Sequence, residues 1–319
     1  MKRASLRHRI EYALVASVRA VIRLLPEPVA RALGTSIGWT FYLVDGGHRR
    51  LAIAQLRMAF PTRSQAECRA IARATFAHFG RLLVALLQFS RLPPDVIRTR
   101  VEYEGLDRVR DAASQGRGIL FFTGHFGFWE LHAIAHPLVP LVPPMAVLAR
   151  ALDNPLLHDL LEDARTRTGN RVIYRRGAVR RVLRALQANE SVALLIDQHI
   201  QPADAVTVEF FGRPASTTNA LATLALRTNA TLIPVFALPL GRGRYRMIYD
   251  APVERPPADS PDPVRDLTQR CTDVLEMYVR RHPHLWLWMH RRWRDTEAAT
   301  PAVPGMFPAA AADEPERAE

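Results

Sequence analysis

Residues 119–131 read Ile-Leu-Phe-Phe-Thr-Gly-His-Phe-Gly-Phe-Trp-Glu-Leu, and this stretch decides how the rest of the chain is interpreted. Its four leading apolar residues predict a buried β-strand, which ends at Thr-Gly directly before an imidazole, His125. A carboxylate, Glu130, follows after four aromatic or glycine positions. Because α/β proteins bind ligands at the carboxyl ends of parallel strands, the two side chains predict a functional site.

The spacing of His125 and Glu130 limits how they can meet. On a regular helix, the intervening residues rotate the side chain by about 500°, so the two would not share a face. They can meet only if His125 lies in a turn before a helix that begins near Phe128, and the glycines that flank His125 allow such a turn. A lone histidine at a strand end is more often structural, but the glycines, the carboxylate and the aromatic residues favour catalysis here. We expect His125 to accept a proton and Glu130 to orient it.

Beyond Pro93-Pro94 the sequence pattern changes from helical to alternating. Residues 1–92 are predicted to be helical throughout, and a capping box at Ser64 and Glu67 predicts the start of a helix over 65–87. After residue 101, short apolar runs alternate with amphipathic stretches, which favours an α/β domain with a largely parallel sheet flanked by helices. The predicted strands are 119–122, 145–148, 192–196, 232–237 and 245–248, and the predicted helices are 128–136, 155–168, 179–188, 219–228 and 263–282.

The chain is strongly basic, with a formal net charge of +12. Such a surface implies an anionic partner, and the absence of an aromatic-basic RNA motif, a zinc finger or a basic zipper disfavours nucleic acid. The two cysteines are predicted to be reduced. No nucleotide fingerprint occurs, so we expect no cofactor, and a metal site at His132 and His136 is the weaker interpretation of that pair.

Two apolar segments near the N-terminus, residues 10–25 and 29–44, are each interrupted by arginine and follow a basic start. This pattern favours helices that lie on a membrane surface, although helices of a soluble bundle would show it too. The Gly-x-Ser-x-Gly pattern at 34–38 lies inside the second segment and is interpreted as small-residue helix packing. We therefore expect a membrane-associating helical region over 1–92, an α/β domain over 93–295 and a disordered Ala/Pro-rich acidic tail over 296–319.

Four further clusters carry polar groups in suggestive places. Arg150 directly follows a predicted strand and suits a phosphate or carboxylate, or equally a surface ion pair. Asp197 and Gln198 end another strand, and Thr217 or Thr218 is expected to cap the helix over 219–228. Residues 285–294 combine three tryptophans with basic side chains, which suits lipid headgroups or a capped core with arginines directed outward.

Taken together, these segments resemble the late acyltransferases of lipid A biosynthesis, the lauroyl and myristoyl enzymes within the HX4D/E glycerolipid acyltransferase superfamily. Residues 124–131 look like the Gly-His-Phe-Gly-Asn-Trp-Glu-Leu block of that family. Arg150 together with 153–155 looks like the family's second block. Segments that look like the remaining blocks follow in the family's order at 197–198, 210–217, 233–235 and 286–293. Phe128 departs from the family pattern, which usually has Asn there, and His199 replaces a residue that is often acidic.

The resemblance implies a glycerolipid-acyltransferase-like fold and transfer of an acyl chain from acyl carrier protein or CoA to a hydroxyl of an anionic membrane lipid, a lipid A precursor above all. It implies catalytic roles for His125 and Glu130, no metal, and a place on the cytoplasmic face of the inner membrane, peripheral or anchored by the N-terminal helices. The substrate-binding residues that it implies are Arg150, Asn154, Asp197, Gln198, Gly127, Phe128 and Trp129. Another phospholipid or glycolipid acceptor, a thioesterase-type hydrolase and a non-catalytic membrane-surface protein remain alternatives.

Overall fold

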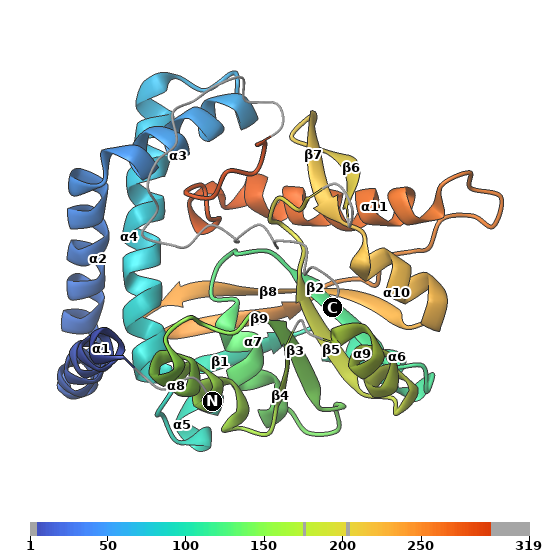
Figure 1. The fold of residues 1–319 in the computed structure, drawn as a ribbon, viewed down its shortest axis with the longest axis horizontal. Coiled ribbons are helices and arrows are strands. Elements are labelled where there is room, and N and C mark those ends of the chain that lie inside the picture. The colour runs from blue at the N-terminus through green and yellow to red at the C-terminus, as the bar shows by residue number, and fades with distance from the viewer. Residues whose placement is uncertain (1–4, 175–176, 202–204, 295–319) are drawn as a thin grey trace, which may run out of the picture.

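The computed structural model describes residues 5–174, 177–201 and 205–294, so the tail expected over 296–319 lies outside the described residues. The N-terminal part is helical, as the sequence predicts, and α2 lies alongside the long α4 (Figure 1). Its helices are α1 (Leu6–Leu24), α2 (Glu27–Val44), α3 (Gly46–Ala59), α4 (Gln65–Phe89) and α5 (Pro94–Arg100).

Local chemistry explains where α4 begins and how it packs. The predicted capping box is present: the Ser64 hydroxyl accepts from the Glu67 N–H, and the Glu67 carboxylate accepts from the Ser64 N–H at 2.8 Å. Helix α2 then approaches α4 closely, because a Cβ atom at Gly38 would lie 2.1 Å from the carbonyl oxygen of Phe76. The glycine pattern at 34–38 is therefore helix packing, as predicted.

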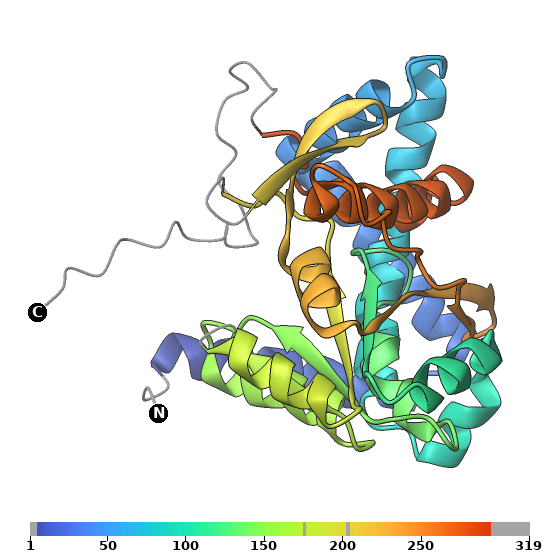
Figure 2. The same cartoon turned by 90° about the vertical axis from the view of Figure 1, so that its right-hand side faces the viewer.

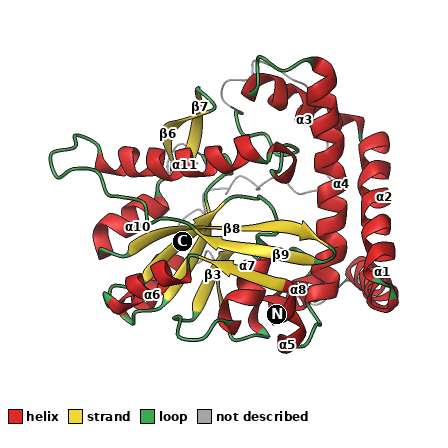
Figure 3. Ribbon diagram, turned by 180° about the vertical axis from the view of Figure 1, so that it is seen from behind, coloured by secondary structure: helices red, strands yellow, loops and turns green. Residues whose placement is uncertain are grey.

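A seven-stranded sheet, ordered β1-β9-β8-β2-β5-β3-β4, forms the centre of the molecule (Figure 3). All neighbouring strands are parallel except β8 and β9, which are antiparallel, so the predicted mixed and largely parallel sheet is confirmed. The predicted strands correspond to β2 (Ile119–Thr123), β3 (Met145–Ala149), β5 (Ser191–Leu195), β8 (Thr231–Gly241) and β9 (Arg244–Tyr249).

Four strands were not expected from the sequence: β1 (Val101–Glu104), β4 (Arg171–Tyr174), β6 (Ala205–Phe210) and β7 (Arg213–Thr218). The first two are short and carry charged residues, so they lack the apolar run of a buried strand. Strands β6 and β7 form a separate antiparallel hairpin beside α11 (Figure 2). Thr217 lies in β7 and is not a helix cap; Asn219 occupies the cap position of α10 (Ala220–Thr228), and the Thr218 hydroxyl accepts from the N–H of Ala220.

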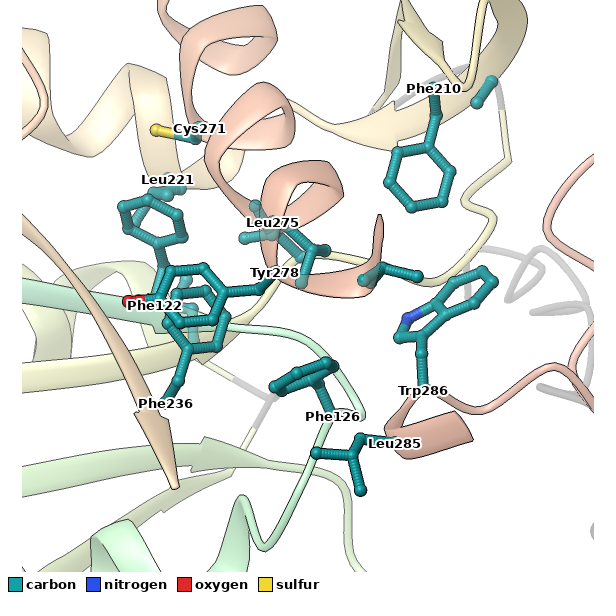
Figure 4. Close-up of a cluster of buried hydrophobic side chains, with 14 of the residues drawn as sticks. Phe122, Phe126, Phe210, Leu221, Phe236, Cys271, Leu275, Tyr278, Leu285 and Trp286 are labelled. Carbon is teal, nitrogen blue, oxygen red and sulfur yellow. The ribbon is translucent and has the colours of Figure 1, made fainter. Parts of the chain in front are cut away.

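Helices cover both faces of the sheet, which explains why β2 reads as a continuous apolar run. Phe121 packs into a cluster with α7 (Glu130–Ala135) and α6 (Leu106–Ser114), whereas Phe122 packs into a cluster with α10 and α11 (Pro263–Arg281). Figure 4 shows the second cluster, in which Phe122 lies near Leu221 and Phe236. The remaining helices are α8 (Pro155–Thr166) and α9 (Ala178–Gln187), with short 3₁₀ turns at His136–Leu138 and Pro283–Leu285.

Among the described residues, one helix, α4, is long and apolar enough to cross a membrane. Slightly more than half (56%) of its most apolar window is buried inside the protein, against α2 and the other elements that surround it. This burial is typical of a core helix as well as of a membrane span.

Candidate active site

His125 lies in the turn between β2 and α7, as the spacing requires. Helix α7 begins at Glu130, and the chain between it and β2 turns sharply at Gly127, whose φ is +58°. A Cβ atom at Gly127 would lie 2.1 Å from the carbonyl oxygen of Ala237, so only glycine fits. The turn is fixed further because the Gly127 N–H donates to the Leu285 carbonyl (2.9 Å) and the Leu287 N–H donates to the His125 carbonyl (3.1 Å).

The His125 ring is held by Asp197. Its Nδ1 lies 2.8 Å from Oδ1 of Asp197, and its backbone N–H donates to Oδ2 of the same carboxylate at 2.7 Å. Trp286 donates its indole N–H to Oδ2 as well, at 2.9 Å. The sheet register brings the pair together, because β2 and β5 are parallel neighbours that end side by side. Asp197 therefore fixes the ring orientation and leaves Nε2 as the nitrogen for proton transfer.

The electrostatics of this pair favour a charged histidine. Burial opposes the imidazolium of His125, but the charge and hydrogen bond of Asp197, together with the charge of Glu130, outweigh it and raise the His125 pKa. Burial likewise opposes the Asp197 carboxylate, yet His125 and the Trp286 N–H lower the pKa of Asp197 to about 2. Asp197 is 3% exposed, so this carboxylate is both ionised and sealed from water.

Glu130 has a different partner from the one expected. Its carboxylate accepts two hydrogen bonds from Arg165 on α8, from Nε at 2.8 Å and from Nη2 at 2.5 Å. The hydrogen bond that we expected between Glu130 and His125 is made by Asp197 instead, because α7 begins at Glu130 and packs against α8. Glu130 acts on His125 through its charge, which contributes to the raised pKa of the ring. Arg165 was not expected, since nothing in its helix distinguishes it from other solvated arginines.

A small pocket with a cavity volume of about 40 Å³ lies at the ends of the central strands, and Thr123 and Trp129, on either side of the His125 turn, are among its lining residues. Trp129 forms part of its wall, and the Trp129 ring centroid lies 5.2 Å from that of His125. The Glu130–Arg165 pair contributes the charged part of the lining, and β3, β5 and β8 contribute mostly apolar side chains. The lining therefore combines one ion pair with a mostly apolar interior.

Three of the other predicted substrate residues lie at the same edge of the sheet. Arg150 follows β3 and is exposed, and Gln198 is exposed beside Asp197. Asn154 is buried and its side chain is fully used: Oδ1 caps α8, and Nδ2 donates to the His8 carbonyl (3.0 Å) and to Glu11 (2.9 Å) of α1. Asn154 therefore holds α1 against α8 and does not contact the pocket lining.

Phe128 lies outside the site. Its side chain is fully buried between Phe89 and Tyr245, with ring centroids 5.5 and 5.0 Å away, so it has no surface for a substrate. The substrate-binding role that the resemblance implies for Phe128 is therefore not supported by its place in the core. The departure from Asn at this position is a change in the hydrophobic core.

The backbone N–H groups next to His125 are already engaged, which excludes them as donors to a developing oxyanion. Phe126 donates to the Gly124 carbonyl (2.7 Å), and Phe128 donates to the Ala237 carbonyl (3.0 Å). The Gly127 N–H likewise donates to the Leu285 carbonyl (2.9 Å).

The chain matches the family model described as "Bacterial lipid A biosynthesis acyltransferase" over residues 1–295. It is 27% identical to a "Lipid A biosynthesis acyltransferase" of Haemophilus influenzae over 278 residues, which cover 86% of each chain. It is also 27% identical to the "Lipid A biosynthesis lauroyltransferase" of Escherichia coli (87% of this chain and 89% of the relative) and 24% identical to the "Lipid A biosynthesis myristoyltransferase" of that organism (82% and 79%). The match spans the whole site, from the turn that carries His125 to the segment that carries Trp286, and the chain belongs to the bacterial lipid A biosynthesis acyltransferase family.

Proposed function

We propose that this acyltransferase moves an acyl chain from a thioester to a hydroxyl of a lipid A precursor with His125 as general base. Nε2 takes the proton of the acceptor hydroxyl, and the oxygen attacks the thioester carbonyl. The C–S bond breaks as the tetrahedral intermediate collapses, and the departing sulfur takes the proton from the imidazolium. The ester and a free thiol are the products. The observation that carries this proposal is the hydrogen bond between His125 and the buried carboxylate of Asp197.

Asp197 and Glu130 act as positioning residues in this scheme. Asp197 holds the tautomer with the proton on Nδ1 and stabilises the imidazolium that forms during attack. Glu130 adds negative charge near the ring, and its bidentate pair with Arg165 keeps that charge fixed at the pocket wall. Arg150, exposed at the end of β3, is proposed to bind a phosphate of the substrate.

The donor is proposed to be an acyl thioester of acyl carrier protein, with CoA as the second candidate. Acyl carrier protein is acidic, and the +12 charge of this chain favours encounter with such a partner. Both donors occur in the cytoplasm, which supports a place on the cytoplasmic face of the inner membrane.

Replacement of His125 by Ala tests the chemistry. Transfer from acyl carrier protein or CoA thioester to a lipid A precursor should be abolished, while thermal unfolding stays close to wild type. Near-normal turnover by this variant would contradict the mechanism. Free fatty acid formed at the same rate without the lipid acceptor would favour a thioesterase instead.

Helix α1 supports attachment to the membrane surface. Its apolar side chains recur at helical spacing along the exposed face: Leu6, Ile10, Leu14, Val18, Val21 and Leu24. The opposite face packs on α4 and α8, and Arg7 and Arg9 lie among the exposed residues. An exposed apolar stripe with flanking arginines suits the interface of an anionic bilayer. We propose residues 1–92 as the membrane-associating region and 93–295 as the catalytic domain.

A further inference from the structure

One stretch of the chain, residues 164–189, is strongly basic. It contains eight arginines and no aspartate or glutamate, so it contributes a large part of the net charge of +12. Two of these arginines are neutralised by acidic side chains from outside the stretch: Arg165 binds Glu130, and Arg171 forms an ion pair with Glu190. The positive charge that is exposed and grouped lies on helix α9.

Three arginines of α9, Arg180, Arg181 and Arg184, form what we call the α9 patch. All three are exposed, and Arg180 and Arg184 lie one helical turn apart on the same face, while the opposite face of the helix packs into the core. The main elements that pack against α9, which are β4, β5 and α10, carry no acidic residue. Within the described parts of the chain, Arg180 and Arg184 form no ion pair. The α9 patch therefore presents uncompensated positive charge to a partner.

The α9 patch lies at the same edge of the sheet as the catalytic histidine. Strands β2, β5, β3 and β4 are parallel neighbours, so their carboxyl ends share one edge. His125 follows β2, Arg150 follows β3, and α9 begins at Ala178, shortly after β4 ends. Three strand spacings separate β2 from β4, a distance of roughly 15 Å. A partner that is bound at the first turn of α9 is thus beside the site, but α9 itself is outside the reach of a group that reacts at His125.

The α9 patch faces away from α1, the proposed membrane contact. The chain steps outward from β3 through α8 to β4 and returns through α9 to β5, so right-handed crossovers place α8 and α9 on opposite faces of the sheet. Figure 1 shows α9 on one side of these strands and α8 on the other, with α1 beyond α8. The patch also exposes a single large apolar side chain, Val179, whereas the outer face of α1 is apolar along its length. This charged and largely polar surface suits an acidic protein better than a bilayer.

We propose that the α9 patch docks an acidic acyl carrier protein, which then delivers its thioester to His125 along the carboxyl edge of the sheet. The thioester of such a carrier is attached through a long, flexible prosthetic arm, which suits a docking surface set apart from the reacting atoms. The inference rests on the proposed thioester donor and deepens it, because it assigns a surface to the carrier protein that CoA does not need.

A binding experiment tests the surface without turnover. Acyl carrier protein loaded with an acyl chain is titrated into enzyme that carries His125→Ala, and fluorescence anisotropy gives the Kd. Combined Arg180→Glu and Arg184→Glu should raise the Kd roughly 10- to 100-fold, because like charges then face each other. The Kd of the parent should also rise with added salt, and that of the reversed variant should depend less on salt.

The matched control reverses two arginines elsewhere. Arg69 and Arg73 of α4 are also exposed and four positions apart, and they lie away from α9 (Figure 1). Arg69→Glu with Arg73→Glu changes the net charge by the same amount and should leave the Kd within about twofold. Thermal unfolding checks that both double variants are folded, as expected for exposed side chains.

Kinetics with His125 intact separate the carrier protein from CoA. The reversed α9 pair should raise KM for acyl carrier protein and leave kcat unchanged, while KM for acyl-CoA of the same chain length stays as in the wild type. An equal loss with acyl-CoA would overturn the inference, since the arginines would then bind phosphates of a small donor.

Three further outcomes decide the matter. A control pair that weakens carrier binding as much as the α9 pair would show an effect of net charge and overturn the inference. Unchanged carrier binding in the α9 variant overturns it too, and weaker sedimentation with phosphatidylglycerol vesicles would then assign the patch to the membrane. If neither thioester supports transfer, the proposed donor fails, whereas the Kd measured on the His125→Ala enzyme still decides whether α9 docks the carrier.

Discussion

Helix α1 and the segment over 285–293 have similar compositions and opposite placements. Both combine large apolar side chains with arginines, and from sequence both suited a membrane surface. In the structure, Leu6 and Leu24 of α1 are 74% and 85% exposed, whereas Trp286, Trp288 and Trp293 are at most 1% exposed. The tryptophans therefore cap the core, and the headgroup interpretation of that segment is wrong.

The difference lies in what each segment's polar groups bind. In the C-terminal segment, Gln55 donates to the carbonyls of Trp288 (2.6 Å) and His290 (2.7 Å) and accepts from the Arg292 N–H (2.9 Å). The Arg292 guanidinium is buried too and donates to Ser216 and Thr217 of β7. Helix α1 is joined to the domain by Asn154, by Gln88, whose Nε2 donates to the Ile22 carbonyl (3.4 Å), and by one apolar face. Amphipathic composition thus identifies an apolar surface, and polar contacts from distant residues decide whether protein covers it.

The largest effect is expected at Asp197, where the C-terminal segment contacts the site. Asp197→Asn should lower the transfer rate by about 10³–10⁴-fold, because the ring tautomer and the imidazolium lose their support. The neutral form of His125 is the base, so wild-type activity falls as the pH drops through the raised pKa of His125. Without the carboxylate, burial dominates and lowers that pKa, so the residual activity of the variant should persist to lower pH. A pH–rate profile of each protein measures both effects.

An unshifted acidic limb in Asp197→Asn would contradict the pairing of Asp197 with His125. Glu130→Gln is the informative companion, since Glu130 acts on the ring through charge alone. It should move the limb in the same direction by a smaller amount. The double variant that combines Glu130→Gln with His125→Ala should transfer no more slowly than His125→Ala alone.

The second prediction removes the hydrogen bonds that Gln55 makes with the C-terminal segment, and leaves the side chains of the site unchanged. Gln55→Leu keeps the volume of the side chain but leaves two carbonyls and one N–H of the C-terminal segment unpaired in the core. We expect the free energy of unfolding to fall by about 2–5 kcal/mol. Denaturant unfolding measures this loss. A change below about 0.5 kcal/mol would mean that these hydrogen bonds do not hold the segment.

The same contrast explains which parts of the fold and of the site can be predicted from the sequence. The turn at His125 could be predicted because its glycines, strand and helix are adjacent in sequence. Asp197 could not be paired with His125, since that contact spans 72 positions and depends on β2 and β5 being neighbours. The strand order of a sheet is not encoded in local periodicity. The Glu130–Arg165 pair and the contacts of Gln55 with the C-terminal segment were missed for the same reason.

The third prediction concerns the exposed face of α1. Leu14→Ser removes apolar surface that contacts no core cluster, so the free energy of unfolding should change by less than about 0.5 kcal/mol. Binding to vesicles that contain anionic phosphatidylglycerol should weaken by roughly tenfold, as expected for one leucine withdrawn from a membrane interface. Ala16→Ser, on the less exposed side of the helix, serves as the control in vesicle sedimentation. Undiminished sedimentation of Leu14→Ser would contradict attachment through this face.

The smallest effect is expected at Trp286, where the core and the site share one hydrogen bond. Trp286→Phe keeps a large aromatic ring in the cluster but removes the N–H that binds Oδ2 of Asp197. The Asp197 pKa should rise from about 2, because that N–H helps to lower it, yet the carboxylate stays ionised at neutral pH and keeps its two bonds to His125. We therefore expect a loss of no more than about tenfold in kcat, with KM unchanged, since the substituted group positions a carboxylate and touches no substrate. A loss as large as that of Asp197→Asn would show that Trp286, rather than the β2–β5 register, places the carboxylate at the ring.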